Sequence, residues 1–195
     1  MIENIFIIGN GESRLSIDLK YLRESGKIYG CNALYRDFHP DVLVSVDDRM
    51  TKEIIDSGYN ETHYHRILKE YRNGKNVYDV VDNNNVKIGV TQGLSSGALA
   101  TLLACEREWC KNIYLIGFDF YKTDKVNNVY KDTPNYSKST DRPIDPNSFR
   151  IQMNRIIKEH PFRTFIWVND YHRKIFNFNN FDIMYINEFK EKFEA

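Results

Sequence analysis

Small polar residues follow the first apolar run of the chain, where their chemistry suits an anionic ligand. Ile5 to Ile8 is a short β-branched run, and Gly9-Asn10-Gly11-Glu12-Ser13 comes directly after it. Glycines let the backbone approach a phosphate or ribose closely, and free N–H groups in such a turn can hold an anion. The turn lacks the third glycine of a dinucleotide fingerprint and the Gly-Lys-Ser/Thr of a P-loop. We expect Asn10, Gly11 and Ser13 to bind a nucleotide, with a plain tight turn as the alternative.

Two later segments offer similar hydrogen-bonding groups. Asn32 follows the apolar run Ile28 to Cys31, and its side chain carries both a donor and an acceptor for a base edge or a ribose. Ser95-Ser96-Gly97 opens a strongly helical segment, where hydroxyls and free N–H groups can bind phosphate or sugar oxygens. The alternatives are an Asx turn at Asn32, and ordinary helix capping with close packing at Gly97.

Carboxylates and a tyrosine end two further apolar runs. Asp47-Asp48 follows Val42 to Val46, and adjacent carboxylates at a strand end can hold Mg²⁺ or Mn²⁺ against a diphosphate. The same pair can equally cap the next helix. Asp119 and Tyr121 follow Ile113 to Ile116, and a buried tyrosine normally places its hydroxyl on a partner. Tyr121 therefore has a structural alternative to any role in chemistry.

These polar residues are spaced by segments that alternate between strand and helix patterns. Expected strands, in addition to the four runs above, are 86–90, 164–168 and 182–186. Expected helices are 16–24, 50–57, 95–109 and 147–160, the third with Ala98, Leu99, Leu102, Leu103 and Trp109 on its buried face. Alternating strands and helices predict an α/β fold, a Rossmann-like parallel sheet with helices on both faces. Ligands of such sheets bind at the carboxyl ends of the strands, which is where the polar residues fall.

The stretch from Tyr121 to Asn147 is long, polar and rich in Asp, Asn, Lys and Pro. A loop of this length inside a compact domain is usually functional, so we expect a lid-like insertion at about 121–147. We find no linker and no repeat, and interpret 1–195 as a single α/β domain that binds a nucleotide sugar.

Composition excludes several classes of protein. The 27 basic residues balance 27 acidic ones, which gives no strong indication of nucleic-acid binding. Three scattered cysteines do not suggest a secreted disulfide framework. The N-terminus does not resemble a signal peptide, and no apolar run reaches the length of a transmembrane segment. We expect a cytoplasmic protein.

Together, four motifs resemble those of a known family. The motifs are Ile7-Ile8-Gly9-Asn10-Gly11-Glu12-Ser13, Cys31-Asn32-Ala33-Leu34-Tyr35, Ser95-Ser96-Gly97 and Ile113-Tyr114-Leu115-Ile116-Gly117-Phe118-Asp119-Phe120-Tyr121. Their order resembles the bacterial sialyltransferases of Campylobacter lipooligosaccharide synthesis, and Thr133-Pro134-Asn135-Tyr136 is similar to the lid of that family. The resemblance covers about residues 4 to 157.

The resemblance implies a glycosyltransferase-like enzyme. It implies transfer of a sugar from a CMP-sialic-acid-like donor to a glycan or small-molecule acceptor without a metal, in a self-associating protein. It implies contacts to the nucleotide from Asn10, Ser13, Asn32, Ser96 and Gly97. Tyr121 and Tyr130 would match tyrosines that help the phosphate leave, since hydroxyl donors favour a developing negative charge.

One departure from the family leaves three functions open. The family's general base is a lid histidine, and the chain has none between Tyr121 and Ser148. Asp141 or Asp145 can accept the proton instead, or the chain binds and sequesters a nucleotide without turnover. A second resemblance lies in His39-Pro40-Asp41-Val42-Leu43-Val44-Ser45-Val46-Asp47, which is similar to archaeal-type hydroxymethylpterin pyrophosphokinase-like proteins and related proteins of phages and glycan gene clusters. It implies Mg²⁺- or Mn²⁺-dependent diphosphate transfer to a small heterocycle through Asp47 and Asp48.

Overall fold

A parallel β-sheet forms the centre of the molecule. The computed structural model describes residues 3–59, 65–67 and 93–194. In these ranges the strands form one seven-stranded sheet in the order β4-β3-β2-β1-β5-β6-β7, with every pair parallel. The strands are β1 (Asn4–Ile8), β2 (Lys27–Cys31), β3 (Val42–Ser45), β4 (His65–Ile67), β5 (Asn112–Ile116), β6 (Thr164–Val168) and β7 (Phe181–Met184). The predicted α/β, Rossmann-like fold is confirmed.

The order of the strands creates a switch point beside β1. From β1 the chain adds β2, β3 and β4 on one side, and then returns to add β5, β6 and β7 on the other. β1 therefore has β2 and β5 as neighbours, with Ile7 opposite both Tyr29 and Leu115. A crevice forms outside the carboxyl ends of strands at such a point. The turns after β1, β2 and β5 consequently meet at one edge of the sheet.

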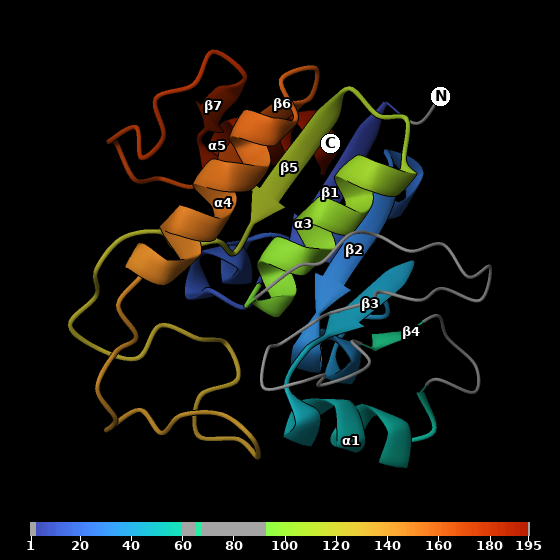
Figure 1. Cartoon of the computed structure of the whole chain (residues 1–195), viewed down its shortest axis with the longest axis vertical. Helices are drawn as coiled ribbons and strands as arrows, with labels where there is room; N and C mark the ends of the chain where they lie inside the picture. Colours follow the sequence, from blue (N-terminus) through green and yellow to red (C-terminus); the bar gives the residue numbers. More distant parts are fainter. Residues whose placement is uncertain (1–2, 60–64, 68–92, 195) are drawn as a thin grey trace.

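Alternating side chains bury both faces of the sheet under helices. Ile5 and Ile7 of β1 pack in the cluster that includes α3 (Ser96–Arg107) and α4 (Asn147–Glu159). Phe6 and Ile8 pack in the opposite cluster, which includes α1 (Asp48–Asp56) and α5 (Ile186–Phe193). Figure 1 shows α3 and α4 side by side in front of the strands, with α5 behind them. Helices on both faces explain why the strands read as continuous apolar runs.

The helix predicted at 16–24 is present only in part, and as 3-10 helix. Two 3-10 helices, η1 (Glu12–Ser16) and η2 (Leu19–Glu24), replace it, because Ile17 is extended and Asp18 caps η2 by accepting from the Lys20 N–H. A third, η3 (Asn32–Arg36), follows β2. The remaining predicted helices and strands agree with the structure to within a few residues, and the strand expected at 86–90 lies outside the described residues.

Trp109 does not lie on the buried face of α3, as the sequence predicted. The helix ends at Arg107, and the next residue, Glu108, is extended. Trp109 therefore lies in the connection to β5, with 79% of its surface exposed.

No regular element occurs between β5 and α4. Residues 117–146, all of them described, contain neither helix nor strand. This segment includes most of the predicted lid-like insertion and returns across the carboxyl edge of the sheet, as Figure 1 shows in yellow and light orange. Its place at that edge brings it beside the turns that follow β1 and β2.

Candidate functional site

A cavity lies at the carboxyl edge of the sheet, at the switch point. Its volume is about 200 Å³, below the roughly 300–1,000 Å³ of pockets for drug-sized ligands. The cavity formed by the described residues is therefore smaller than a whole nucleotide sugar would need. The lining residues come from the turns after β1, β2 and β5, the first turn of α3, the 117–146 loop and α4: Gly9, Asn10, Gly11, Cys31, Asn32, Ser95, Ser96, Gly97, Ala98, Gly117, Phe118, Asp119, Phe120, Asn127, Asn128, Tyr136, Phe149 and Met153.

The cavity brings together most of the residues that were predicted to bind a nucleotide. Seven of the eight line it: Asn10, Gly11, Asn32, Ser95, Ser96, Gly97 and Asp119. The eighth, Ser13, is one bond away, because its N–H donates to Asp119 Oδ2 at 3.2 Å. Segments separated by more than 80 residues in the sequence thus contribute to one wall. Whether they bind a nucleotide stays a prediction.

Asn32 and Ser96 join two sides of this cavity. The Ser96 hydroxyl donates to Asn32 Oδ1 at 2.7 Å, which connects the end of β2 to the start of α3. Asn32 has a φ of 53°, a left-handed conformation that residues other than glycine adopt mainly as Asn or Asp. Strained backbone of this kind gathers at ligand sites. The Asn32 side chain thus bonds Ser96 and also belongs to the lining of the cavity.

Within the described residues, the glycine turn after β1 offers one free N–H group, that of Asn10, rather than the several that the sequence suggested. The Gly9 N–H donates to Ile116 O at 2.7 Å and the Gly11 N–H to Gly117 O at 2.9 Å. The N–H groups of Glu12 and Ser13 also donate within the protein. A Cβ at Gly9 would lie 2.5 Å from Gly117 O, so the two turns need glycine to approach one another. Gly9 and Gly117 therefore allow the backbones of these two turns to pack against each other.

Free donors come instead from asparagines. Asn127 Oδ1 accepts from the Glu12 N–H at 2.8 Å, and Asn128 Oδ1 accepts from the Tyr130 N–H at 2.9 Å. Because a backbone N–H can only donate, these bonds fix which atom of each amide is the oxygen. The Nδ2 groups of Asn32, Asn127 and Asn128 have no hydrogen-bond partner within the described residues.

The first turn of α3 adds two more donors. Ser95 caps the helix, its Oγ accepting from the Ala98 N–H and its own N–H donating to Gln152. The N–H groups of Ser96 and Gly97 have no intrahelical acceptor, as is general for the start of a helix, and no other described group bonds them. Both residues line the cavity at the positive end of the helix dipole.

The cavity presents these donors without a cation. None of its described lining residues is Lys or Arg. The one carboxylate, Asp119, accepts from the Ser13 N–H through Oδ2 and from Asn169 Nδ2 through Oδ1 at 2.9 Å. Its oxygens thereby cross-link the ends of β1, β5 and β6. The arrangement suits an acceptor-rich group, such as a phosphate monoester or a sugar, held by neutral N–H donors.

A hydrogen bond between Asn10 and Tyr136 joins the turn after β1 to the 117–146 loop. Asn10 Nδ2 donates to the Tyr136 hydroxyl at 3.1 Å, and the Ala33 N–H donates to the same oxygen at 3.3 Å. Asn10 Oδ1 is buried without a partner among the described residues. A buried acceptor left unpaired is costly, which makes this oxygen a candidate contact for a ligand.

The predicted catalytic residues lie outside the cavity lining. Tyr121 stacks on Tyr171, with ring centroids 4.7 Å apart. Burial, reinforced by Asp119, raises the pKa of Tyr121. The Tyr130 hydroxyl accepts from Arg14 Nη2 at 2.7 Å and donates to Asp37.

Asp141 and Asp145 are exposed on the loop. Asp141 accepts from the Lys138 N–H at 2.7 Å, and Asp145 accepts from the Asn147 N–H at 2.9 Å. Their role in proton transfer stays a prediction.

Asp47 and Asp48 are also away from the cavity. Asp47 caps α1, its Oδ1 accepting from the N–H groups of Arg49 and Met50 at 3.1 Å each. Asp48 is the exposed first residue of that helix. In the described ranges no three His, Cys, Asp or Glu side chains gather as a metal site. The helix-capping alternative accounts for the position of Asp47.

Sequence reasoning missed the loop residues of the site. Asn127, Asn128 and Tyr136 lie in a polar stretch that predicted a lid, without indicating which side chains face the ligand. The apolar wall formed by Phe118, Phe149 and Met153 was not predicted as part of the site.

Comparisons with known proteins do not name the site. No family model, no curated protein and no solved structure matches the chain. The resemblance to sialyltransferases and the weaker one to pyrophosphokinase-like proteins therefore stay predictions. In the described part of the chain, no helix is long and apolar enough to cross a bilayer.

Proposed function

We propose that this chain binds a nucleotide-activated sugar in the carboxyl-edge cavity and transfers the sugar to a hydroxyl of a glycan or small-molecule acceptor. One observation carries the proposal: unspent donors from Asn32, Asn127, Asn128 and the first turn of α3 surround one cation-free cavity. The phosphate and sugar oxygens of such a donor are rich in acceptors and fit this set.

The same donors suit the departure of the nucleotide. As the bond between the sugar carbon and the phosphate oxygen breaks, negative charge grows on the phosphate. The side-chain NH₂ groups of the three asparagines and the N–H groups at the start of α3 are already held in place. They therefore stabilise that charge without reorganising. The acceptor oxygen bonds to the sugar carbon and gives up its proton, for which Asp141 and Asp145 remain the predicted acceptors.

Nucleotide binding is tested by melting-temperature shifts with a panel of nucleoside monophosphates and nucleotide sugars, CMP and CMP-sialic acid among them. A ligand at 100 times its Kd adds about 2.7 kcal/mol of stability. Asn128→Asp keeps the oxygen that accepts from the Tyr130 N–H and replaces the free NH₂ with a negative oxygen, so it should abolish the shift. Asn147→Asp, on the exposed start of α4, adds the same charge outside the cavity and should preserve it. A panel that shifts nothing overturns the proposal.

A second function, binding without turnover, is favoured by the positions of the tyrosines. Tyr121 and Tyr130 do not line the cavity, and the Tyr130 hydroxyl is bonded to Arg14 and Asp37. Release of free nucleotide during incubation with donor and acceptor panels distinguishes the two. Tight binding with no release favours a nucleotide-sequestering module over a transferase.

A further inference from the structure

One wall of the cavity belongs to a loop that has no secondary structure of its own. Asn127, Asn128 and Tyr136 line the cavity, and residues 117–146 form neither helix nor strand. The backbone of this loop forms turn hydrogen bonds and one bond to Asn10 O, from the Val129 N–H at 2.8 Å, but no ladder, so side chains contribute much of what holds it in place. Tyr136 lies beside a cluster of polar side chains around Arg36 and Glu53, neither of which lines the cavity.

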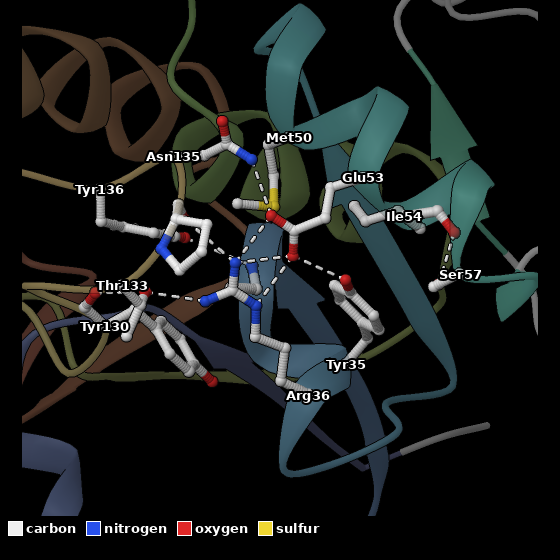
Figure 2. Close-up of polar contacts among 12 residues, drawn as sticks. Tyr35, Arg36, Met50, Glu53, Ile54, Ser57, Tyr130, Thr133, Asn135 and Tyr136 are labelled. Carbon is white, nitrogen blue, oxygen red and sulfur yellow. Dashed lines mark hydrogen bonds and ion pairs between the residues drawn. The ribbon is translucent and has the colours of Figure 1, made fainter.

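An ion pair between two elements forms the centre of this cluster. Arg36 ends η3 and Glu53 lies on α1. Arg36 Nε donates to Glu53 Oε1 at 2.8 Å, and Nη2 donates to Oε1 and Oε2 at 2.6 and 2.7 Å. Tyr35 adds a bond from its hydroxyl to Glu53 Oε1 at 2.7 Å. Figure 2 shows Arg36, Glu53 and Tyr35 converging. A bidentate arginine–carboxylate pair fixes geometry as well as charge.

Both members of the pair also bond the loop. Arg36 Nη1 donates to Thr133 Oγ1 at 2.8 Å, and Nη2 donates to Pro134 O at 3.0 Å. Asn135 Nδ2 donates to Glu53 Oε2 at 2.7 Å. Three consecutive loop residues are thus bonded to the pair, and Figure 2 shows these bonds for Thr133 and Asn135. The next residue is Tyr136, whose hydroxyl accepts from Asn10 and Ala33.

The surroundings of Arg36 and Glu53 favour the charged forms of both side chains. The side chains of Arg36 and Glu53 are 22% and 23% exposed. The Arg36 guanidinium carbon also lies 5.8 Å from the centre of the Tyr136 ring, within the range of a cation–π contact. Burial alone would raise the pKa of Glu53, but the bonds from Arg36, Tyr35 and Asn135 outweigh it and lower that pKa.

We propose that Arg36 and Glu53 are positioning residues for the cavity: they lie outside it, and they hold Thr133, Pro134 and Asn135 so that Tyr136 stands against Asn10 and Ala33 as part of its wall. The effect on ligand affinity rests on the proposed function. The effect on the loop does not, because it concerns the protein without ligand.

Hydrogen exchange of the ligand-free protein tests the loop. Glu53→Gln removes the charge and one acceptor oxygen. The N–H groups of Ala33 and Tyr136, which donate to Tyr136 Oη and Thr133 O, should exchange faster by about tenfold or more. Leu115 in the central strand β5 should keep its protection, which excludes global unfolding. Asp56→Asn is the matched control, because Asp56 forms an exposed ion pair with Lys52 on the same helix. If Glu53→Gln does not fold, Thr133→Val takes its place, because it removes the loop hydroxyl that accepts from Arg36 Nη1.

Affinity for the best nucleotide of the panel gives the second measurement. Glu53→Gln should weaken binding by about fivefold to tenfold, while Asp56→Asn leaves it unchanged. Unchanged exchange at Ala33 and Tyr136 overturns the proposal, and so does faster exchange with wild-type affinity. If wild type binds no nucleotide, the proposed function fails and the exchange data alone decide whether the pair holds the loop.

Discussion

The hydroxyl of Ser96 donates to the Oδ1 atom of Asn32 across 2.7 Å, joining the start of α3 to the end of β2. This bond spends the oxygen of the amide and leaves its NH₂ group for the cavity. Asn32 holds that position at a φ of 53°. The contact therefore couples backbone conformation, element packing and the proposed ligand site in one residue.

Replacing Asn32 separates these effects. Asn32→Ala loses the bond and keeps a Cβ in the left-handed region, so we expect a loss of about 1–2 kcal/mol in the free energy of unfolding. Asn32→Gly relieves the backbone and should stay closer to wild type. Both variants should lose the melting-temperature shift with nucleotide. Wild-type nucleotide affinity in Asn32→Gly would exclude the side chain from the site. Urea unfolding and thermal shift measure the two quantities.

Gly117 tests whether the turns after β1 and β5 need glycine for close approach. Its φ is +71°, and an added Cβ would lie 2.8 Å from Gly9 O. Gly117→Ala should cost at least about 2 kcal/mol, from backbone strain and overpacking together. Gly93 has the same φ with no atom of the described residues within 4 Å of an added Cβ, so Gly93→Ala should report mainly the strain, about 1 kcal/mol. Equal losses in urea unfolding would show that the contact with Gly9 contributes nothing.

β1, β2, β3, β5 and β6 could be predicted because nearly all of their residues are buried, whereas β4 was not predicted. The run Ile5–Ile8 is apolar throughout, and β1 packs under α3 on one face and α5 on the other. The place of the site followed, since carboxyl ends of parallel strands meet at one edge. α5 was missed because Ile186–Phe193 is short and polar at five of its eight positions, with Ile186, Phe189 and Phe193 as its buried residues.

The partners of the site residues could not be predicted, because they are distant in the sequence. The pattern after β1 suggested free N–H groups, but residues 106 to 115 positions away accept from those of Gly9, Gly11, Glu12 and Ser13. A family resemblance gave Tyr130 a catalytic role without indicating that its hydroxyl bonds Arg14, 116 positions earlier. Local sequence predicts which groups are present, and tertiary packing decides which remain unspent.

The Glu53 carboxylate gives a pH dependence whose sign follows from its bonds. Its pKa in the folded protein is lowered from an ordinary value of 4.5, so the unfolded chain binds more protons in the window below 4.5. The contribution is fully present above that value and is lost as pH falls through the lower folded pKa. The gap in unfolding free energy between wild type and Glu53→Gln should therefore shrink from neutral pH to about pH 3. A gap that is constant with pH would show that the charge of Glu53 does not matter.

Asp47 distinguishes a helix cap from a metal ligand. Its Oδ1 accepts from the N–H groups of Arg49 and Met50 at the start of α1, and it does not line the cavity. Asp47→Ala should cost about 1 kcal/mol, while Asp47→Asn, an equally good cap, should preserve stability. Under the proposed function neither Asp47→Asn nor EDTA changes nucleotide affinity, because neutral N–H donors hold the phosphate. Diphosphate transfer through a metal requires the reverse: affinity that falls with EDTA and in Asp47→Asn, since an amide is a far weaker Mg²⁺ ligand than a carboxylate.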